Sequence, residues 1–431
     1  MLGWNVFLGQ RQILPSVSLR SVTDMISHTD MQGLAVIYFA KIDPCYGFVN
    51  RDQVNGGIQK RWLPDSRQST FDAVLCGIAA IGCVFSNLQD LQTEANLFNL
   101  AKSFLNLSGP ENISVDIATA WVLCTVYLRL TATPDETWIA SCTALHIIDA
   151  AGLHCEPDAN ASFRSASHVC APDTRRRILG VARHLNVWLS FDLGRTRVIL
   201  QNMSTVSPAP QDGDFTTELL GLLSYTENMD PSKDISGPEL VTAVSEVLDR
   251  THTQPPSVLA QCNLMLCLYR RLYTLRWPVA DEIMGKAVHL IERGIQAVHT
   301  SIEAGSPWHH VANVPFQSIC TLLAIDTVQS FSLLRPTLLC LAAVSNTFQT
   351  KATKDALTAA HALISMHQKR RETDVLRQSE MLKLYPASEP AGDDMFEHFD
   401  LNQAQAFTDL PWFNEFFSDS EITNFINGAS Y

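Results

Sequence analysis

Helical spacing of apolar residues is the feature of this 431-residue chain that most limits its fold. Residues 71–85 form a nearly continuous apolar run, longer than a typical strand, in which Gly77 and Gly82 allow close packing. In residues 94–105 the apolar side chains recur every three or four positions. Alternation of apolar and polar residues, the mark of a half-buried strand, is scarce. The sequence therefore predicts an all-α fold.

The same pattern places further helices and the breaks between them. We expect helices over 34–42, 117–130, 136–151, 174–193, 257–275, 280–302, 316–334 and 352–371. Breaks are expected over 204–214, 228–238, 251–256 and 303–315, where Pro, Gly and polar residues gather. The expected organisation is a connecting segment at 1–30, a large multi-helix body in two parts at 31–220 and 221–384, and a flexible acidic tail at 385–431.

The charge of the chain is uneven. The formal net charge is −13, from 31 basic and 44 acidic residues. After Lys383 the sequence has nine acidic residues and no Lys or Arg, so the remainder is nearly balanced. A net negative charge argues against a surface that mainly coats nucleic acid, because phosphate binding needs clustered basic residues. Acidic tails of this kind are often interaction segments.

Cysteine spacing and hydropathy limit the compartment. No two of the eleven cysteines are separated by only two residues, which excludes zinc ribbons, zinc fingers and redox pairs within these residues. The longest clean apolar stretch, 73–85, is too short to span a bilayer, and the run over 321–344 is interrupted by Asp326, Arg335 and Pro336. With no signal peptide visible, we expect a soluble intracellular protein with reduced thiols and no membrane partner.

Catalytic signatures are missing from the sequence. It has no nucleophile elbow, phosphate loop, dinucleotide fingerprint or zinc-protease motif. His309 and His310 are adjacent, so on a helix their side chains are not expected to share a face, and the six-residue spacing of His361 and His367 does not suit a metal. We expect each to be a surface histidine or an interior histidine with its hydrogen bonds satisfied. The sequence predicts no enzyme, and no catalytic, cofactor-binding or metal-binding residue.

Two neighbouring phrases carry a family resemblance. Residues 144–154 read ALHIIDAAGLH, and residues 173–196 begin with DTRRRILG and end with WLSFDLGRT. In this order they resemble the middle homology region of fungal zinc-cluster (Zn2Cys6) transcription factors. Residues 38–51 are similar to the opening of that region, and the resemblance covers roughly residues 30–350. It implies a transcriptional regulator whose helical body serves regulation, dimerisation or effector sensing.

The residues that carry the resemblance suit structural roles. Gly152 is expected to end a helix in the left-handed conformation, the arginine run to pair with acids of neighbouring helices, and Gly194-Arg195 to turn the chain after a buried helix. The scaffold residues of the family motif are Gly152, Leu153, His154, Arg175, Arg176, Arg177, Gly194 and Arg195.

The chain departs from the family pattern in several places. Leu179-Gly180 stand where two Trp are usual, Asn186-Val187 replace a usual Asp-Arg pair, and Thr196 replaces the final Pro. The six-cysteine DNA-binding motif is absent from these residues. Three explanations stay open. The gene has lost that module, the gene model is truncated, or the protein regulates without touching DNA itself. Zinc is expected only with such a module, and DNA contact only through it or indirectly.

A narrower resemblance concerns regulators of fungal polyketide clusters. Residues 1–10 and 46–51 are similar to regulators of neosartoricin-type aromatic polyketide clusters. This likeness implies a nuclear protein that controls one secondary-metabolite gene cluster.

The tail alternates bulky apolar residues with acids. This composition fits an acidic activation segment that presents a short helix to a coactivator or mediator-type protein. The expected anchors are Leu410, Trp412, Phe413, Phe416 and Phe417. The alternative is a C-terminal helix that docks on the protein's own body.

Two other classes of function stay open. The chain could be a dimerising scaffold or dominant-negative regulator, pairing with itself or with a relative that carries a DNA reader. It could also be a small-molecule-binding helical protein, which a pocket with converging polar groups would favour.

Overall fold

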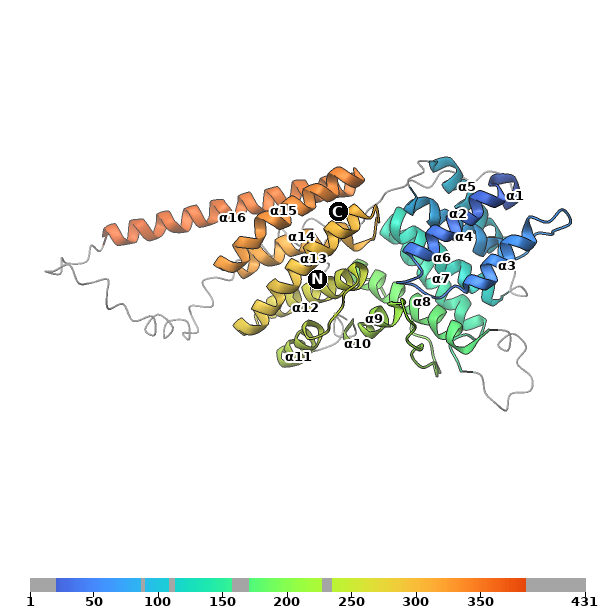
Figure 1. The fold of residues 1–431 in the computed structure, drawn as a ribbon. Helices are drawn as coiled ribbons and strands as arrows, with labels where there is room; N and C mark the ends of the chain where they lie inside the picture. Colours follow the sequence, from blue (N-terminus) through green and yellow to red (C-terminus); the bar gives the residue numbers. More distant parts are fainter. Residues whose placement is uncertain (1–20, 87–89, 108–112, 157–169, 227–234, 385–431) are drawn as a thin grey trace. The chain divides into compact units, whose positions relative to one another are not determined.

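Every regular element that the structure describes is a helix. The computed structural model describes residues 21–86, 90–107, 113–156, 170–226 and 235–384, and no strand occurs in these ranges. The predicted all-α fold is therefore confirmed for the described residues (Figure 1).

Most of the expected helices are present, whereas the helices over 51–61 and 237–248 are not among those expected from the sequence. Their bounds are α1 Val22–Met25, α2 His28–Lys41, α3 Arg51–Arg61, α4 Phe71–Phe85, α5 Leu91–Leu107, α6 Val115–Thr131, α7 Pro134–Ala150, α8 Pro172–Leu193, α9 Thr216–Gly221, α10 Leu223–Thr226, α11 Gly237–Leu248, α12 Pro255–Thr274, α13 Asp281–Glu303, α14 His310–Ile325, α15 Val328–Phe348 and α16 Lys351–Leu384. The expected division after residue 30 falls inside α2, and the one after residue 220 falls at the end of α9.

Helix α4 is the centre of the N-terminal helices. All of its residues from Asp72 to Phe85 are buried, and it packs against α2, α5 and α6. Its two glycines make the close approach possible: a Cβ at Gly77 would lie 3.0 Å from the Cβ of Leu123, and one at Gly82 would lie 2.6 Å from the carbonyl oxygen of Leu34. Both glycines thus have the packing role that the sequence predicts.

Helix α12 is the centre of the later helices, as α4 is of the earlier ones. It contacts α11, α13 and α14, and α15 packs against α13 and α14. The short helix α9 contacts both α8 and α12, which joins the later helices to the earlier ones. The helices from α6 to α8 also pack in sequence order, α6 on α7 and α7 on α8. This arrangement places the end of α7, the start of α8 and the segment before α9 next to one another.

One predicted helix, 316–334, is wrong. Helix α14 ends at Ile325 because Asp326 adopts the left-handed conformation, with φ +53°. Thr327 and Ser330 then form a capping box that starts α15. Pro315, expected in a break, and Pro336, expected to interrupt the apolar run, both lie inside helices.

Helix α15 is more apolar than the interrupted run at 321–344 indicates, because Asp326 lies outside the helix. It is the one described helix with the length and apolar content needed to cross a bilayer, judged by these two properties alone. It packs on α13 and α14, with Cys340, Leu341 and Val344 fully buried.

The described chain divides into two compact units. The first includes the described residues up to Ala360, and the second includes the rest of α16 from His361. Helix α16 is longer than the predicted helix at 352–371. Its later part exposes apolar side chains such as Val375, Leu376 and Leu382 beside several basic residues.

We predict different effects on stability for Gly82→Ala in α4 and Gly33→Ala in α2. Gly82→Ala should lower the free energy of unfolding by about 1–3 kcal/mol, because the new methyl group overlaps the backbone of Leu34. Gly33→Ala, in α2, should be neutral or stabilising by about 0.5–1 kcal/mol, because no atom lies within 4 Å of the added Cβ. Urea unfolding of both variants measures the difference, and a stable Gly82→Ala protein would contradict the close α2–α4 contact.

Candidate functional site

The first family phrase ends helix α7. Gly152 has φ +67°, the left-handed conformation expected for it. Its N–H donates to the carbonyl oxygen of Asp149, and the N–H of the buried Leu153 donates to that of Ile148. His154 follows with Nδ1 3.3 Å from an oxygen of Asp149, and its carbonyl accepts hydrogen bonds from Ser204 and Thr205. The phrase therefore holds the irregular segment after α8 against the end of α7.

Arg175 and Arg176, the first two arginines of the run, both bind residues just after the first family phrase. Arg175, 1% exposed, donates from Nη1 to the carbonyl oxygen of Cys155 at 2.7 Å. Arg176 donates to both carboxylate oxygens of Glu156, at 2.7 and 3.1 Å. Hydrogen bonding from Arg176 lowers the pKa of Glu156. Glu156 also accepts from the N–H of Val206, so this pair reaches the segment after α8 as well.

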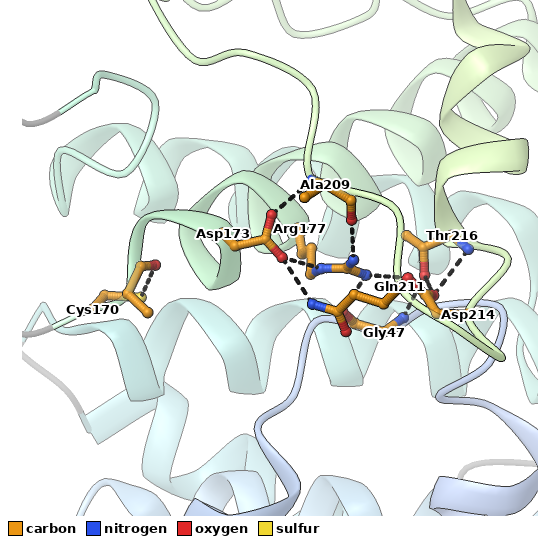
Figure 2. Close-up of polar contacts among 9 residues, drawn as sticks. Gly47, Cys170, Asp173, Arg177, Ala209, Gln211, Asp214 and Thr216 are labelled. Carbon is orange, nitrogen blue, oxygen red and sulfur yellow. Dashed lines mark hydrogen bonds and ion pairs between the residues drawn. The ribbon is translucent and has the colours of Figure 1, made fainter.

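Arg177 is the centre of a larger polar cluster, drawn in Figure 2. Only 4% exposed, it donates to Asp173 at 2.6 Å, to Asp214 at 2.5 Å, and to the carbonyl oxygens of Gly47 and Ala209 at 3.2 and 2.6 Å. Its partners come from α8 itself, from the turn before α3 and from the segment before α9. We call this set, Gly47, Asp173, Arg177, Ala209 and Asp214, the Arg177 cluster.

The carboxylates of the Arg177 cluster are themselves hydrogen-bonded. Asp173 accepts from the N–H of Ala209 at 2.8 Å, and Asp214 accepts from the N–H and the hydroxyl of Thr216. Burial alone would raise the pKa of Asp173, but the hydrogen bonds from Arg177 and Ala209 outweigh it and lower that pKa. The arginine run thus pairs with acids, as predicted, although Asp214 and Glu156 lie in loops and not on neighbouring helices.

The second family phrase ends α8. Gly194 is left-handed, with φ +59°, and the N–H of Arg195 donates to the carbonyl oxygen of Ser190. Arg195 pairs with Asp135 at 2.7 Å and lies 5.1 Å from the centroid of the Trp138 ring. Trp138 Nε1 donates to Ser190 and to the carbonyl of Thr196. The chain therefore turns after α8, as the sequence predicts, and the structure adds that it then contacts α7.

The five expected tail anchors, Leu410, Trp412, Phe413, Phe416 and Phe417, lie outside the described residues. Their role stays a prediction.

A buried cluster of aromatic rings is the feature that the sequence analysis missed. Rings follow one another with centroid distances of 5.8 Å for His184–Tyr46, 5.2 Å for Tyr46–Trp308 and 5.0 Å for Trp308–His309. The next distances are 4.2 Å for His309–His310 and 6.2 Å for His310–Trp188. Because Trp188 and His184 are four residues apart on α8, the circuit closes there. We call these residues, Tyr46, His184, Trp188, Trp308, His309 and His310, the six-ring cluster.

The six-ring cluster corrects the expectation for the adjacent histidines. His309 is the N-cap of α14 and His310 its first residue, so both rings turn into the same interior and lie 4.2 Å apart. Neither ring nitrogen of the buried His310 has a hydrogen-bond partner within the described residues. His310 is therefore an interior histidine whose side chain makes no hydrogen bond to another described residue. Adjacent side chains on a helix diverge by about 100°, and both rings are nevertheless buried here because the start of α14 is covered on both sides.

A buried ion pair lies beside the six-ring cluster. Arg129 of α6 and Asp192 of α8 are 2.6 Å apart and almost inaccessible to solvent. Burial, together with the positive charge of Arg129, lowers the pKa of His184 to about 3. Burial also lowers the pKa values of His309 and His310 well below the usual range, with Arg129 again adding to the effect. The three histidines are consequently neutral at physiological pH.

No side-chain group among the described residues forms a candidate metal centre. The three histidines of the six-ring cluster are neutral hydrogen-bonding groups packed among aromatic rings.

Comparison with known proteins identifies the family. The protein-family model described as the fungal specific transcription factor domain matches residues 36–299. The chain belongs to this family of transcriptional regulators. The match includes Tyr46, α8, the Arg177 cluster and most of the helical body, and it ends before α14.

Several named relatives resemble nearly the whole chain. Protein RDR1 of Gibberella zeae is 39% identical over 99% of this chain and 79% of its own length. Transcription factor kojR of Aspergillus oryzae is 35% identical over 95% of this chain and 72% of its own. Protein RDR1 of Saccharomyces cerevisiae is 28% identical over 83% of this chain and 67% of its own. These relatives confirm the resemblance to fungal transcription factors.

We predict that Arg177→Lys destabilises the protein by about 2–4 kcal/mol. Lysine keeps the charge but cannot make the forked set of four contacts, so buried oxygens of Asp214 and Ala209 lose a donor. Arg195→Lys is the matched control, because its pair with Asp135 is solvent-exposed and worth about 1 kcal/mol or less. Chemical unfolding compares the two, and equal losses would contradict a special role for Arg177.

We also predict a pH effect that starts from Asp43, next to the Arg177 cluster. Burial raises the pKa of Asp43 from its ordinary 3.8 to about 7, Arg51 and Arg177 oppose this rise, and Asp214 adds to it. The folded chain then binds more protons than the unfolded chain between these values, so the free energy of unfolding falls as pH rises through this window.

The variant Asp43→Asn should reduce that slope and be relatively more stable at pH 8. Unfolding measured from pH 5 to pH 8 tests this, with exposed Asp52→Asn as the control for losing one carboxylate. An unchanged slope in Asp43→Asn would contradict the assignment.

Proposed function

We propose that this protein is a pathway-specific activator of one fungal secondary-metabolite gene cluster of the polyketide type, that it acts in the nucleus, and that it is a regulator and not an enzyme. The observation that carries the proposal is similarity along 95% of the chain to a protein named as a transcription factor, kojR, together with the match to the fungal specific transcription factor domain. The family resemblance of residues 1–10 and 46–51 to polyketide-cluster regulators supports the narrower part.

DNA contact is proposed to be indirect or to depend on a module outside these residues. The net charge of −13 argues against a surface that neutralises many phosphates, and the sequence has no Cys-x-x-Cys pair, the spacing expected in a zinc cluster. Zinc belongs to the proposal only with such a module. A homodimer, or pairing with a relative that carries its own DNA reader, would bring the helical body to promoters.

The dominant-negative alternative follows from the same observation. A chain that dimerises with a relative but adds no second DNA reader would reduce that relative's binding to paired half-sites. Overexpression separates the two functions, because an activator raises transcription of its target cluster whereas an interfering chain lowers it.

The test of the main proposal combines gene deletion with chromatin immunoprecipitation of the tagged chain. Transcripts of one contiguous biosynthetic cluster should fall together, and the tagged protein should be enriched at promoters of that cluster and located in the nucleus. Scattered transcript changes, or a tagged protein excluded from the nucleus, would contradict the proposal.

A separate prediction concerns the tail and its coactivator partner. When residues 385–431 are fused to an unrelated DNA-binding domain, Phe413→Ala/Phe417→Ala should reduce reporter output several-fold, because a coactivator groove would lose two anchors on one helical face. Phe396→Ala/Phe399→Ala, in the same tail, is the matched control and should leave the output nearly unchanged. Equal output from both double variants would remove the anchor assignment.

A further inference from the structure

The end of helix α16 exposes a face that is both apolar and basic. Val375, Leu376 and Leu382 are 59%, 64% and 73% exposed, and Lys369 and Lys383 are exposed as well. Residues seven apart lie two turns apart on the same side of a helix. Val375 and Leu382 therefore form one row, with Lys369, Leu376 and Lys383 in the row beside it. We call these five residues the α16 stripe.

The described residues leave this end of α16 uncovered. Residues 375–378 and 380–384 are exposed without exception. Single apolar side chains on a surface are ordinary, whereas neighbouring rows of them along one helix are typical of a face that another segment covers. The α16 stripe therefore has the character of a docking surface, and its occupant lies outside the described residues.

The charge of this part of α16 favours an acidic occupant. Residues 361–384 hold five basic residues and three acidic ones. Asp374 lies 3.9 Å from Arg370 and 3.7 Å from Arg377, so it offsets these two arginines only in part. A second copy of α16 would bring the same positive excess to the contact. An acidic segment would instead complement the charge.

The chain itself carries a segment of complementary character. Residues 407–421 read FTDLPWFNEFFSDSE, in which bulky apolar residues alternate with acids and no basic residue occurs. Residues 385–406 connect this segment to the end of α16. A chain of that length reaches up to about 75 Å, whereas residues 369–384 of a helix cover only about 22 Å. Because both partners belong to one chain, their contact has a high effective concentration that a separate molecule lacks.

We propose that residues 407–421 bind the α16 stripe of their own chain and thereby cover the expected activation anchors. The aromatic side chains of the segment pack on the three apolar residues of the stripe, and its carboxylates lie near Lys369 and Lys383. A coactivator that takes the same aromatic side chains must displace the stripe, so the contact holds the activator in an inhibited state. The inhibition rests on the proposed activating function of the tail, whereas the contact itself does not.

Hydrogen–deuterium exchange of the full purified chain tests the contact from both sides. Leu376→Glu/Leu382→Glu should speed exchange in residues 407–421 about tenfold, because it places negative charge where the acidic segment docks. Phe413→Ala/Phe417→Ala should likewise speed exchange in residues 369–384. Raising the salt concentration from about 0.05 to 0.5 M should act in the same direction on the original chain, because part of the attraction is between exposed charges.

Met381→Glu/Leu384→Glu is the matched control. These two side chains are also exposed, at 66% and 74%, and lie in the same turns of α16. Their positions place them on the side of the helix away from the α16 stripe. The control adds the same two charges to the same helix end, so a general effect on α16 would appear in both double variants. It should leave exchange in residues 407–421 unchanged.

A reporter assay tests the inhibition. When the full chain is fused to an unrelated DNA-binding domain, Leu376→Glu/Leu382→Glu should raise reporter output several-fold, because the anchors become available to a coactivator. Met381→Glu/Leu384→Glu should leave the output unchanged.

Three results would overturn the contact. They are equal exchange of residues 407–421 in the stripe variant and its control, exchange of α16 that Phe413→Ala/Phe417→Ala does not alter, or a dimer in sedimentation that the stripe variant dissociates. The last result would make a second copy the occupant. Failure of the transcriptional proposal gives a different pattern, because exchange would change as expected while reporter output stayed at background in every variant.

Discussion

The guanidinium group of Arg177 is the interaction on which the packing of the loops around α8 depends. Removing an arginine from water is costly, and the cost is offset only when its donors find well-placed acceptors. Arg177 meets this condition with two carboxylates and two backbone carbonyls. Because the acceptors come from three separate parts of the chain, one side chain fixes the turn before α3, the start of α8 and the approach to α9 together.

The segment between α8 and α9 shows why polar contacts are needed there. It has no regular secondary structure, and apolar side chains within it, such as Ile199 and Val206, remain largely exposed. Burial of apolar surface therefore contributes little to its position. Hydrogen bonds to the carbonyl of His154, to Glu156 and to Arg177 replace it. The arginine run and the phrase that ends α7 thus act on the same segment, which explains their combination in one family motif.

The sequence predicts the helices better than it predicts the sites. The sequence predicts helix α4 to the residue, because a long apolar run with two glycines allows one interpretation. It does not predict the break at Asp326, because a left-handed Asp has no distinctive neighbours in the sequence, and Pro315 and Pro336 both lie inside helices although proline is typical of breaks. The six-ring cluster cannot be predicted from the sequence for a different reason. Tyr46, His184 and His310 are brought together only by the tertiary fold, and each alone has the pattern of an ordinary core residue.

The divergence of α8 from the family pattern is consistent with its surroundings. Asn186, which stands where the family usually has a charged Asp, is fully buried. Its side-chain nitrogen donates to Ser141, and its side-chain oxygen accepts from the N–H of Val198 at 2.9 Å. A carboxylate could accept but not donate, and it would bring a charge into the interior one helical turn from Ser190 and within two residues of Trp188. The neutral amide satisfies both partners. Asn186 therefore joins α8 to α7 and to the segment after α8 without placing a charge in the interior.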